Sequence, residues 1–190
     1  MSNELCFKTA VELAGLIRDG ELSARELLEV HLDQIERINP QVNAIVTLTD
    51  DLARRQASAA DESQARGEPL GPLHGLPVAH KDLVATAGIR TTWGSPIYAD
   101  FVPSEDALLI ERLKAAGAVI FGKTNVPIDL SDWQSFNEIY GDTVRTSAMD
   151  RGNDRARFSR LCAALGSSRR PSCGPFSSST RWRGMRRSLP

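Results

Sequence analysis

The side chain best placed to do chemistry is Lys81, which stands inside the otherwise apolar segment LPVAHKDLV (residues 76–84). Lysines are rarely buried without a partner, and burial lowers the pKa of an amine until it can act as a base near neutral pH. The alternative is a lysine at the end of a strand that extends into solvent or pairs with Asp82. Spacing alone favours the second interpretation but leaves both open.

A second pattern with chemical meaning is GAVIFGKT (residues 117–124), which matches the text G-x-x-x-x-G-K-[ST] of a phosphate-binding loop. Such a loop needs backbone N–H groups that curl around an anion. Here the residues between the glycines are Ala, Val, Ile and Phe, an apolar run rich in strand formers. We therefore interpret the segment as a buried strand rather than a nucleotide site. Lys123 and Thr124 then lie at its C-terminal end, where open α/β sheets place ligands.

The three histidines and three cysteines show neither metal-ligand spacing nor a disulfide framework. A histidine beside a turn is more often structural, so His80 is not assigned a direct catalytic role. The N-terminus lacks a basic region followed by an apolar one, and no apolar run reaches membrane-spanning length. The sequence therefore predicts no signal peptide, no metal, no cofactor and no membrane partner, and it indicates a reducing cytoplasm.

Helices with clear start signals occupy most of the first 65 residues. Capping boxes at Thr9-Ala-Val-Glu12 and Ser23-Ala-Arg-Glu26 satisfy free N–H groups at two helix starts. Gly20 is expected to end the first of these helices and Asn39-Pro40 the second. A polar helix with one exposed face follows over residues 50–65.

The middle of the chain alternates between strand and helix signals. Residues 44–48 are a short strand or an extended loop, and residues 78–84 are a strand. A helix over residues 105–116, capped by Ser104, leads into a strand over residues 118–122. Strand, helix, strand in this order predicts a parallel crossover inside an α/β sheet. The expected core stripe of the helix is Leu108, Leu109, Leu113 and Ala116.

The charge of the chain changes sign after Gly141. Residues 142–190 contain eleven Arg and no Lys against three acidic residues, a net charge of +8. Residues 1–141 carry twelve basic and twenty-one acidic residues, a net charge of −9. Such asymmetry is typical of a nucleic-acid-binding tail or of a tail that does not belong to the fold. We expect a domain over residues 1–141 and a basic Arg/Ser-rich tail over residues 142–190, with a possible short helix at 155–165 and disorder over 166–190.

Several linked segments closely resemble the amidase signature family. They are GPLHGLPVAHKDLVATAGIRTTWGS (residues 71–95), DALLIERLKAAGAVIFGKTNVP (residues 106–127) and the later Tyr140-Gly141 pair. The helical N-terminus is similar too, so the resemblance covers about residues 5–141. It implies an α/β protein, here the N-terminal part of the amidase-signature fold, with a helical N-terminus followed by a mixed sheet flanked by helices.

The resemblance also implies a reaction and roles for residues. Family members hydrolyse or transfer amides with a Ser–cis-Ser–Lys triad, and Lys81 matches the triad lysine. It would take a proton from the bridging serine, which in turn activates the nucleophilic serine. Thr124 and Asn125 are expected to support the cleft, and Asp82 to orient Lys81 or the neighbouring backbone. Aromatic residues expected in the core or the cleft wall are Trp93, Trp133 and Tyr140.

The chain departs from the family pattern where the two serines belong. The family carries them in a segment of the kind GGSSGGS, expected here near residues 150–180. The nearest similarity is Gly166-Ser167-Ser168, followed by Arg169-Arg170-Pro171 instead of a second glycine pair. The tail is rich in Arg, Ser, Pro, Gly and Cys and lacks Lys and Glu. That composition favours the hypothesis that residues after Gly141 are read in a shifted frame of a GC-rich gene.

The sequence therefore predicts a truncated amidase-family chain with little or no amide hydrolysis of its own. The substrate of an intact member would be a small amide, whose class the sequence leaves open, as it does the oligomeric state. Two alternatives stay open: a binding fragment that associates with a separate partner chain, and a protein that contacts nucleic acid through its basic tail. If sheet neighbours are missing, exposed apolar surface would favour aggregation.

Overall fold

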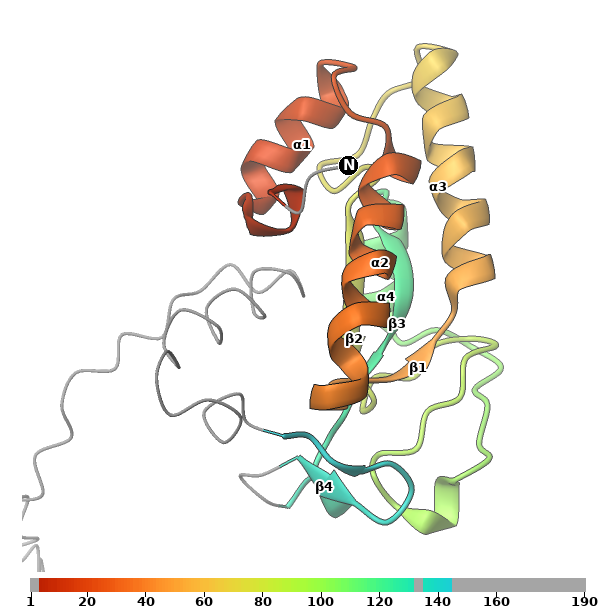
Figure 1. Cartoon of the computed structure of the whole chain (residues 1–190). Helices are drawn as coiled ribbons and strands as arrows, with labels where there is room; N and C mark the ends of the chain where they lie inside the picture. The colour runs from red at the N-terminus through yellow and green to blue at the C-terminus, as the bar shows by residue number, and fades with distance from the viewer. Residues whose placement is uncertain (1–3, 132–134, 145–190) are drawn as a thin grey trace, which may run out of the picture.

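The structure is a computed structural model that describes residues 4–131 and 135–144. Helices α2 and α3 lie side by side across one face of a small sheet, and α4 lies behind it (Figure 1). The predictions about Trp133 and about residues 145–190, including the possible helix at 155–165 and the Gly166-Ser167-Ser168 segment, fall outside the described residues.

Two capped helices open the chain, as predicted. A short 3₁₀ turn, Leu5–Phe7, precedes α1 (Ala10–Arg18), and α2 covers Ala24–Val42. In each helix the N-cap hydroxyl accepts from the backbone N–H three residues later, and the glutamate there accepts from the N-cap N–H. The Asp61 carboxylate of α3 adds to the cap of α2, since it accepts the N–H of Ala24 at 2.7 Å.

The predicted end of α2 at Asn39-Pro40 is wrong, because the helix continues to Val42 with Pro40 in its last turn. The side chain of Asn39 instead accepts the N–H groups of Ala44 and Ile45, at 2.9 and 2.8 Å. The helix ends at Asn43, whose backbone is left-handed with φ 54°. The proline costs one helical hydrogen bond, and it lies at an exposed position near the terminus.

Three strands form a mixed sheet in the order β1-β3-β2. They are β1 (Ile45–Leu48), β2 (Pro77–Lys81) and β3 (Val119–Thr124). β2 pairs with β3 in parallel, which confirms the predicted parallel arrangement, and β1 pairs with β3 antiparallel. GAVIFGKT is thus strand over most of its length, and the phosphate-loop interpretation is excluded. β2 is shorter than the predicted strand at 78–84, because the chain turns after Lys81 and the Val84 N–H donates to the Lys81 carbonyl at 3.2 Å.

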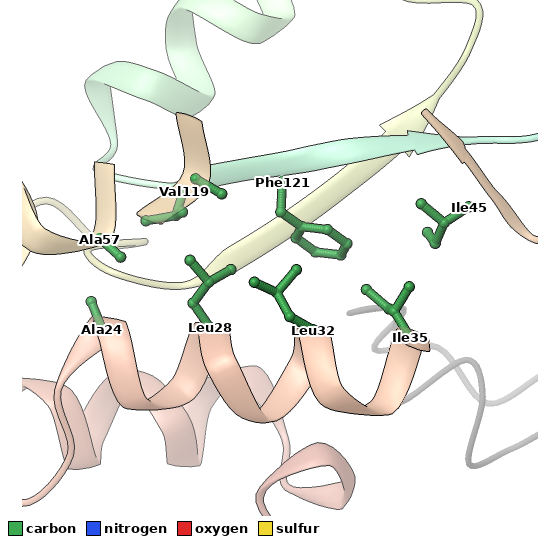
Figure 2. Close-up of a cluster of buried hydrophobic side chains, with 9 residues drawn as sticks. Ala24, Leu28, Leu32, Ile35, Ile45, Ala57, Val119 and Phe121 are labelled. Carbon is green, nitrogen blue, oxygen red and sulfur yellow. The ribbon is translucent and has the colours of Figure 1, made fainter. Parts of the chain in front are cut away.

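The main core lies between α2, α3 and the sheet. Leu28, Leu32 and Ile35 of α2 point toward Val119 and Phe121 of β3 (Figure 2). The polar helix predicted from Asp50 to about Ala65 is α3 (Asp50–Ala65), and its small buried residues, Ala53 and Ala57, complete this core. Phe121 is one of the largest fully buried side chains, so β3 is the central strand in packing as well as in pairing.

Helix α4 (Leu108–Ala115) begins three residues later than predicted, with Ala107 rather than Ser104 at its N-cap. The predicted stripe is wrong for Leu108 and Leu109, which are 60% and 54% exposed, whereas Ile110 is 0% exposed. Ile110 packs with Ile89 and Ile120, and Leu113, one turn on, lies against the same cluster. Because α4 buries the face that carries Ile110 and Leu113, Leu108 and Leu109 lie on the solvent side of the helix.

A small hairpin closes the described part of the chain and was not predicted. Its strands are β4 (Phe136–Asn137) and β5 (Gly141–Asp142), which pair antiparallel. The Asn43 amide at the end of α2 donates to the carbonyls of Tyr140 and Asp142, at 2.7 and 3.0 Å. Two further 3₁₀ turns, Pro96–Tyr98 and Ile128–Leu130, lie in the loops before α4 and after β3.

Candidate active site

The parallel strands β2 and β3 end at one edge of the sheet, and the sequence-predicted site residues lie there. Lys81 is the register partner of Thr124, and the Asp82 N–H donates to the Thr124 carbonyl at 3.0 Å. We call Lys81, Asp82, Lys123, Thr124 and Asn125 the strand-end site. The fold therefore brings together residues that are about forty positions apart in sequence.

Lys81 is exposed, while its neighbours His80 and Asp82 are buried. This alternation follows from strand geometry, in which successive side chains point to opposite faces. Of the two sequence interpretations, the structure agrees with a lysine at a strand end that reaches solvent. The Asp82 carboxylate does not pair with Lys81, as this interpretation allowed, but contacts Thr92 and Lys123 inside the molecule. Lys81 thus presents a solvent-accessible amine on a fixed backbone.

Asp82 is fully buried and holds the backbone ten residues further along the chain. Its Oδ2 accepts the N–H of Thr92 at 3.1 Å and the Thr92 hydroxyl at 2.5 Å. Its carbonyl accepts the N–H of Trp93 at 3.0 Å. Burial raises the pKa of the Asp82 carboxyl, and the bonds from Thr92 and the charge of Lys123 oppose that rise.

Lys123 is the lysine that the fold buries, and sequence reasoning assigned it no chemistry. Its side chain is 0% exposed, and its Nζ donates to the Val84 carbonyl at 2.7 Å and to the Thr91 hydroxyl. The Nζ lies 4.0 Å from Asp82 Oδ1. Burial lowers the pKa of Lys123 to about 8, although the charges of Asp82 and Asp106 raise it. The apolar run before Lys123 indicates a buried strand, but it does not show whether the lysine that ends the strand is itself buried.

His80 stabilises the turn after β2 in its neutral form. Its Nε2 lies 2.7 Å from the Thr86 hydroxyl, which in turn donates to the Val84 carbonyl at 3.2 Å. Burial, together with the charges of Lys123 and Lys114, lowers the pKa of His80 to about 4. A neutral imidazole bonded within the turn fits the structural role expected from sequence.

Asn125 links the end of β3 to the hairpin. Its amide donates to the Gly141 carbonyl and to the Thr143 hydroxyl, both at 3.0 Å. Its Oδ1 accepts from the amide of Asn137 at 2.8 Å. Asn137 is fully buried, and sequence reasoning missed it, because a lone asparagine in a polar stretch carries no local signal. Thr124 is half-buried between its register partners on the two neighbouring strands.

A protein-family model described as Amidase matches residues 26–151 of the chain, a segment that contains the whole strand-end site. The chain belongs to the amidase family. The predicted fold class is confirmed too, since solved amidase-signature structures share this arrangement of helices and mixed sheet.

Several amidase-family proteins are similar to this chain. The A subunit of the glutamyl-tRNA(Gln) amidotransferase of Carboxydothermus hydrogenoformans is 46% identical over 123 residues, which are 65% of this chain and 25% of that protein. A protein solved in a vestigial complex that bears on the evolutionary origins of an s-triazine catabolic enzyme is 37% identical, with a TM-score of 0.70, over 78% of this chain and 32% of the other. A bacterial aryl acylamidase of the amidase signature family is 29% identical, with a TM-score of 0.68, over 72% of this chain and 29% of the other. The chain thus spans about a quarter of the length of the curated relative it matches.

Aromatic side chains form a separate cluster near the strand-end site of this amidase-family chain. The Trp93 ring lies 4.9 Å from the Tyr98 ring and 5.5 Å from the Phe101 ring, and its Nε1 donates to the Leu83 carbonyl at 2.9 Å. Trp93 is half-buried, while Tyr98 and Phe101 are exposed. Tyr140 lies elsewhere, with the Arg90 guanidinium 5.0 Å from its ring centroid.

Within the described ranges 4–131 and 135–144, no group of three or more His, Cys, Asp or Glu side chains is arranged to bind a metal ion. Over the same residues, no helix is both long enough and apolar enough to cross a membrane.

Proposed function

We propose that Lys81 is the base of an amide-hydrolysing or amide-transferring site of the Ser–cis-Ser–Lys type. The observation that supports this best is the contrast along β2, where an exposed Lys81 stands between the buried, hydrogen-bonded side chains of His80 and Asp82. The backbone is fixed on both sides of Lys81, and its amine is accessible to groups supplied from elsewhere. A proton acceptor needs this combination of fixed position and access.

In the proposed reaction the neutral amine of Lys81 accepts the proton of the bridging serine. The bridging serine takes the proton of the nucleophilic serine, which attacks the amide carbonyl. Backbone N–H groups stabilise the oxyanion, and the proton held by Lys81 returns through the bridging serine to the departing amine. The acyl-enzyme is then released to water or to an amine acceptor. The proposed substrate is a small amide, and the proposed location of the reaction is the cytoplasm.

We further propose that the 190-residue chain turns over little or no amide on its own. No segment of the kind GGSSGGS follows Tyr140-Gly141 in this sequence, so none of its serines can be assigned as the bridging or the nucleophilic serine. Residues after Gly141 are, in this proposal, read in a shifted frame. The alternative of nucleic-acid binding depends on residues 142–190 and stays a prediction.

DNA sequencing from the Gly141 codon past the stop codon tests the frame. If another frame restores a Gly/Ser-rich segment, the restored protein is expressed and assayed with simple aliphatic and aromatic amides. Lys81→Ala in that protein is expected to lower kcat/KM roughly a thousandfold, the range of a lost acid–base group. Lys114→Ala, at an exposed site on α4, is the matched control and should leave kcat/KM unchanged. Full activity of Lys81→Ala, or robust turnover by the purified 190-residue chain, would overturn the respective proposal.

A further inference from the structure

We propose that Lys123 and Asp82, the buried pair within the strand-end site, are positioning residues that hold Lys81 in place. That this positioning serves catalysis rests on the proposed function of Lys81, whereas the contacts that hold Lys81 do not depend on that function. Both side chains are fully buried, and neither has a part in the reaction proposed above.

Lys123 contacts the turn that follows Lys81. Its ammonium group donates to the Val84 carbonyl at 2.7 Å. The N–H of the same residue, Val84, donates to the carbonyl of Lys81 at 3.2 Å. Val84 is therefore held on one side by Lys123 and holds Lys81 on the other. A buried charge-assisted hydrogen bond is one of the stronger restraints available to a turn.

Lys123 and Asp82 also bind the chain where it returns, at residues 91–93. Lys123 also donates to the Thr91 hydroxyl, and the Asp82 carboxylate accepts both donors of Thr92. The Trp93 N–H closes this part with a bond to the Asp82 carbonyl at 3.0 Å. The segment that leaves Lys81 is thus tied to the segment that comes back past it.

Lys123 and Asp82 also interact electrostatically. Asp82 Oδ1 is buried without a hydrogen-bond donor among the described residues, and it lies 4.0 Å from Lys123 Nζ. Two opposite charges in the interior repay their desolvation only in part, so such a pair contributes little net stability. Removal of one partner leaves the other charge buried and uncompensated. This arrangement specifies one geometry of the turn more than it stabilises the fold.

The test compares Lys123→Met, Asp82→Asn and the double variant in the 190-residue chain. Lys123→Met is expected to speed amide hydrogen exchange at Val84 and Trp93 roughly tenfold or more relative to amides of α2, the effect of losing one charge-assisted bond. It should also shift the side-chain NMR signal of Lys81. The chain has four lysines, so Lys8 and Lys114 serve as internal controls whose signals should not move.

The double variant separates positioning from simple stability. It removes both charges of the pair, and the amide introduced by Asp82→Asn can still accept from Thr92, so the free energy of unfolding should recover relative to Lys123→Met. The Val84 carbonyl keeps only the weaker bond from the Thr86 hydroxyl, and the Thr91 hydroxyl still lacks the Lys123 donor. Fast exchange at Val84 and the shifted Lys81 signal should therefore persist. Recovery of both signals together with stability would overturn the proposal, as would wild-type exchange at Val84 in any folded variant that lacks Lys123.

If Lys123→Met does not fold, the double variant is compared with the wild type in its place. None of these measurements involves amide turnover, so failure here and failure of the proposed function are distinguishable.

Discussion

Lys81 and Lys123 stand near the ends of neighbouring parallel strands but in opposite environments. Lys81 is exposed, whereas Lys123 is 0% exposed and bonded to the Val84 carbonyl and the Thr91 hydroxyl. The condition that sequence reasoning considered for Lys81, burial with a lowered pKa, is met by Lys123. Lys81 therefore presents its amine to solvent, whereas Lys123 uses its amine for hydrogen bonds inside the molecule.

The first prediction concerns acid stability and His80. Burial and nearby lysines hold the folded-state pKa of His80 at about 4, below the ordinary value of 6.5, so the unfolded chain binds a proton more readily than the folded one in that range. The contribution of neutral His80 to the free energy of unfolding is fully present above pH 6.5 and is lost as the pH falls toward 4. His80→Gln should therefore flatten the fall in the free energy of unfolding between pH 6.5 and 4, by up to about 1.4 kcal/mol per pH unit.

Urea unfolding at a series of pH values measures this slope. Burial also lowers the pKa of His31, which adds a slope of the same sign, while the raised pKa of Asp82 opposes it, so the comparison is between variant and wild type. Thr86→Val is the control, because it removes the hydroxyl that contacts His80 but keeps the titrating ring. Equal slopes in wild type and His80→Gln would contradict the prediction.

Local sequence signals predicted the elements that need only near neighbours. The capping boxes at Thr9 and Ser23 act over three residues, and both helix starts were placed correctly. The apolar run before Lys123 identified β3 in the same way. The end of α2 was missed, because Asn43 and the side chain of Asn39 end it through contacts with residues beyond the helix.

The candidate site was predictable only in part, for the same physical reason. Lys81 was singled out by its place in an apolar segment and Thr124 by its place at a strand end, and the family resemblance gave roles to them and to Asp82 and Asn125. Parallel pairing of their strands explains why these residues meet. The burial of Lys123 depends on Thr91, 32 residues away, and no local pattern encodes that contact. Three-dimensional partners of this kind decide which of two lysines is desolvated.

The second prediction tests the face that α4 buries. Ile110→Ala should lower the free energy of unfolding by about 2–5 kcal/mol, because it opens a cavity against Ile89 and Ile120. Leu109→Ala, one residue earlier in the same helix, should change it by less than about 0.5 kcal/mol, since that side chain is mostly exposed. Denaturant unfolding of the two variants side by side gives both values. A larger loss for Leu109→Ala than for Ile110→Ala would mean that the helix packs by its predicted stripe instead.

The third prediction concerns close approach of backbone at Gly122 in β3. A Cβ built at Gly122 would lie 2.5 Å from the Thr47 carbonyl oxygen of β1, so Gly122→Ala should destabilise the chain by roughly 1–3 kcal/mol. Gly15, inside α1, has no atom within 4 Å of such a Cβ. Gly15→Ala should therefore stabilise the chain by about 0.5–1 kcal/mol through helix propensity. Thermal unfolding should shift the two melting temperatures in opposite directions, and a shift of the same sign would refute the steric account.

The fourth prediction concerns the attachment of the hairpin to the strand-end site. Asn125→Ala removes the amide that donates to the Gly141 carbonyl and the Thr143 hydroxyl, and it leaves these acceptors without that donor. The expected loss is about 2 kcal/mol, the usual effect of breaking a buried hydrogen-bond network. Hydrogen exchange should rise most at the Thr143 N–H, which donates to the Ser135 carbonyl across the hairpin at 2.8 Å, and little in α2.

Ser131→Ala, at an exposed position after β3, is the control and should leave both the free energy of unfolding and the exchange rates near wild type. Uniform acceleration across the molecule would instead assign Asn125 to the global core. Unchanged exchange at Thr143 would show that other contacts, such as the bond from the Asn137 amide to the Val126 carbonyl, are enough to hold the hairpin.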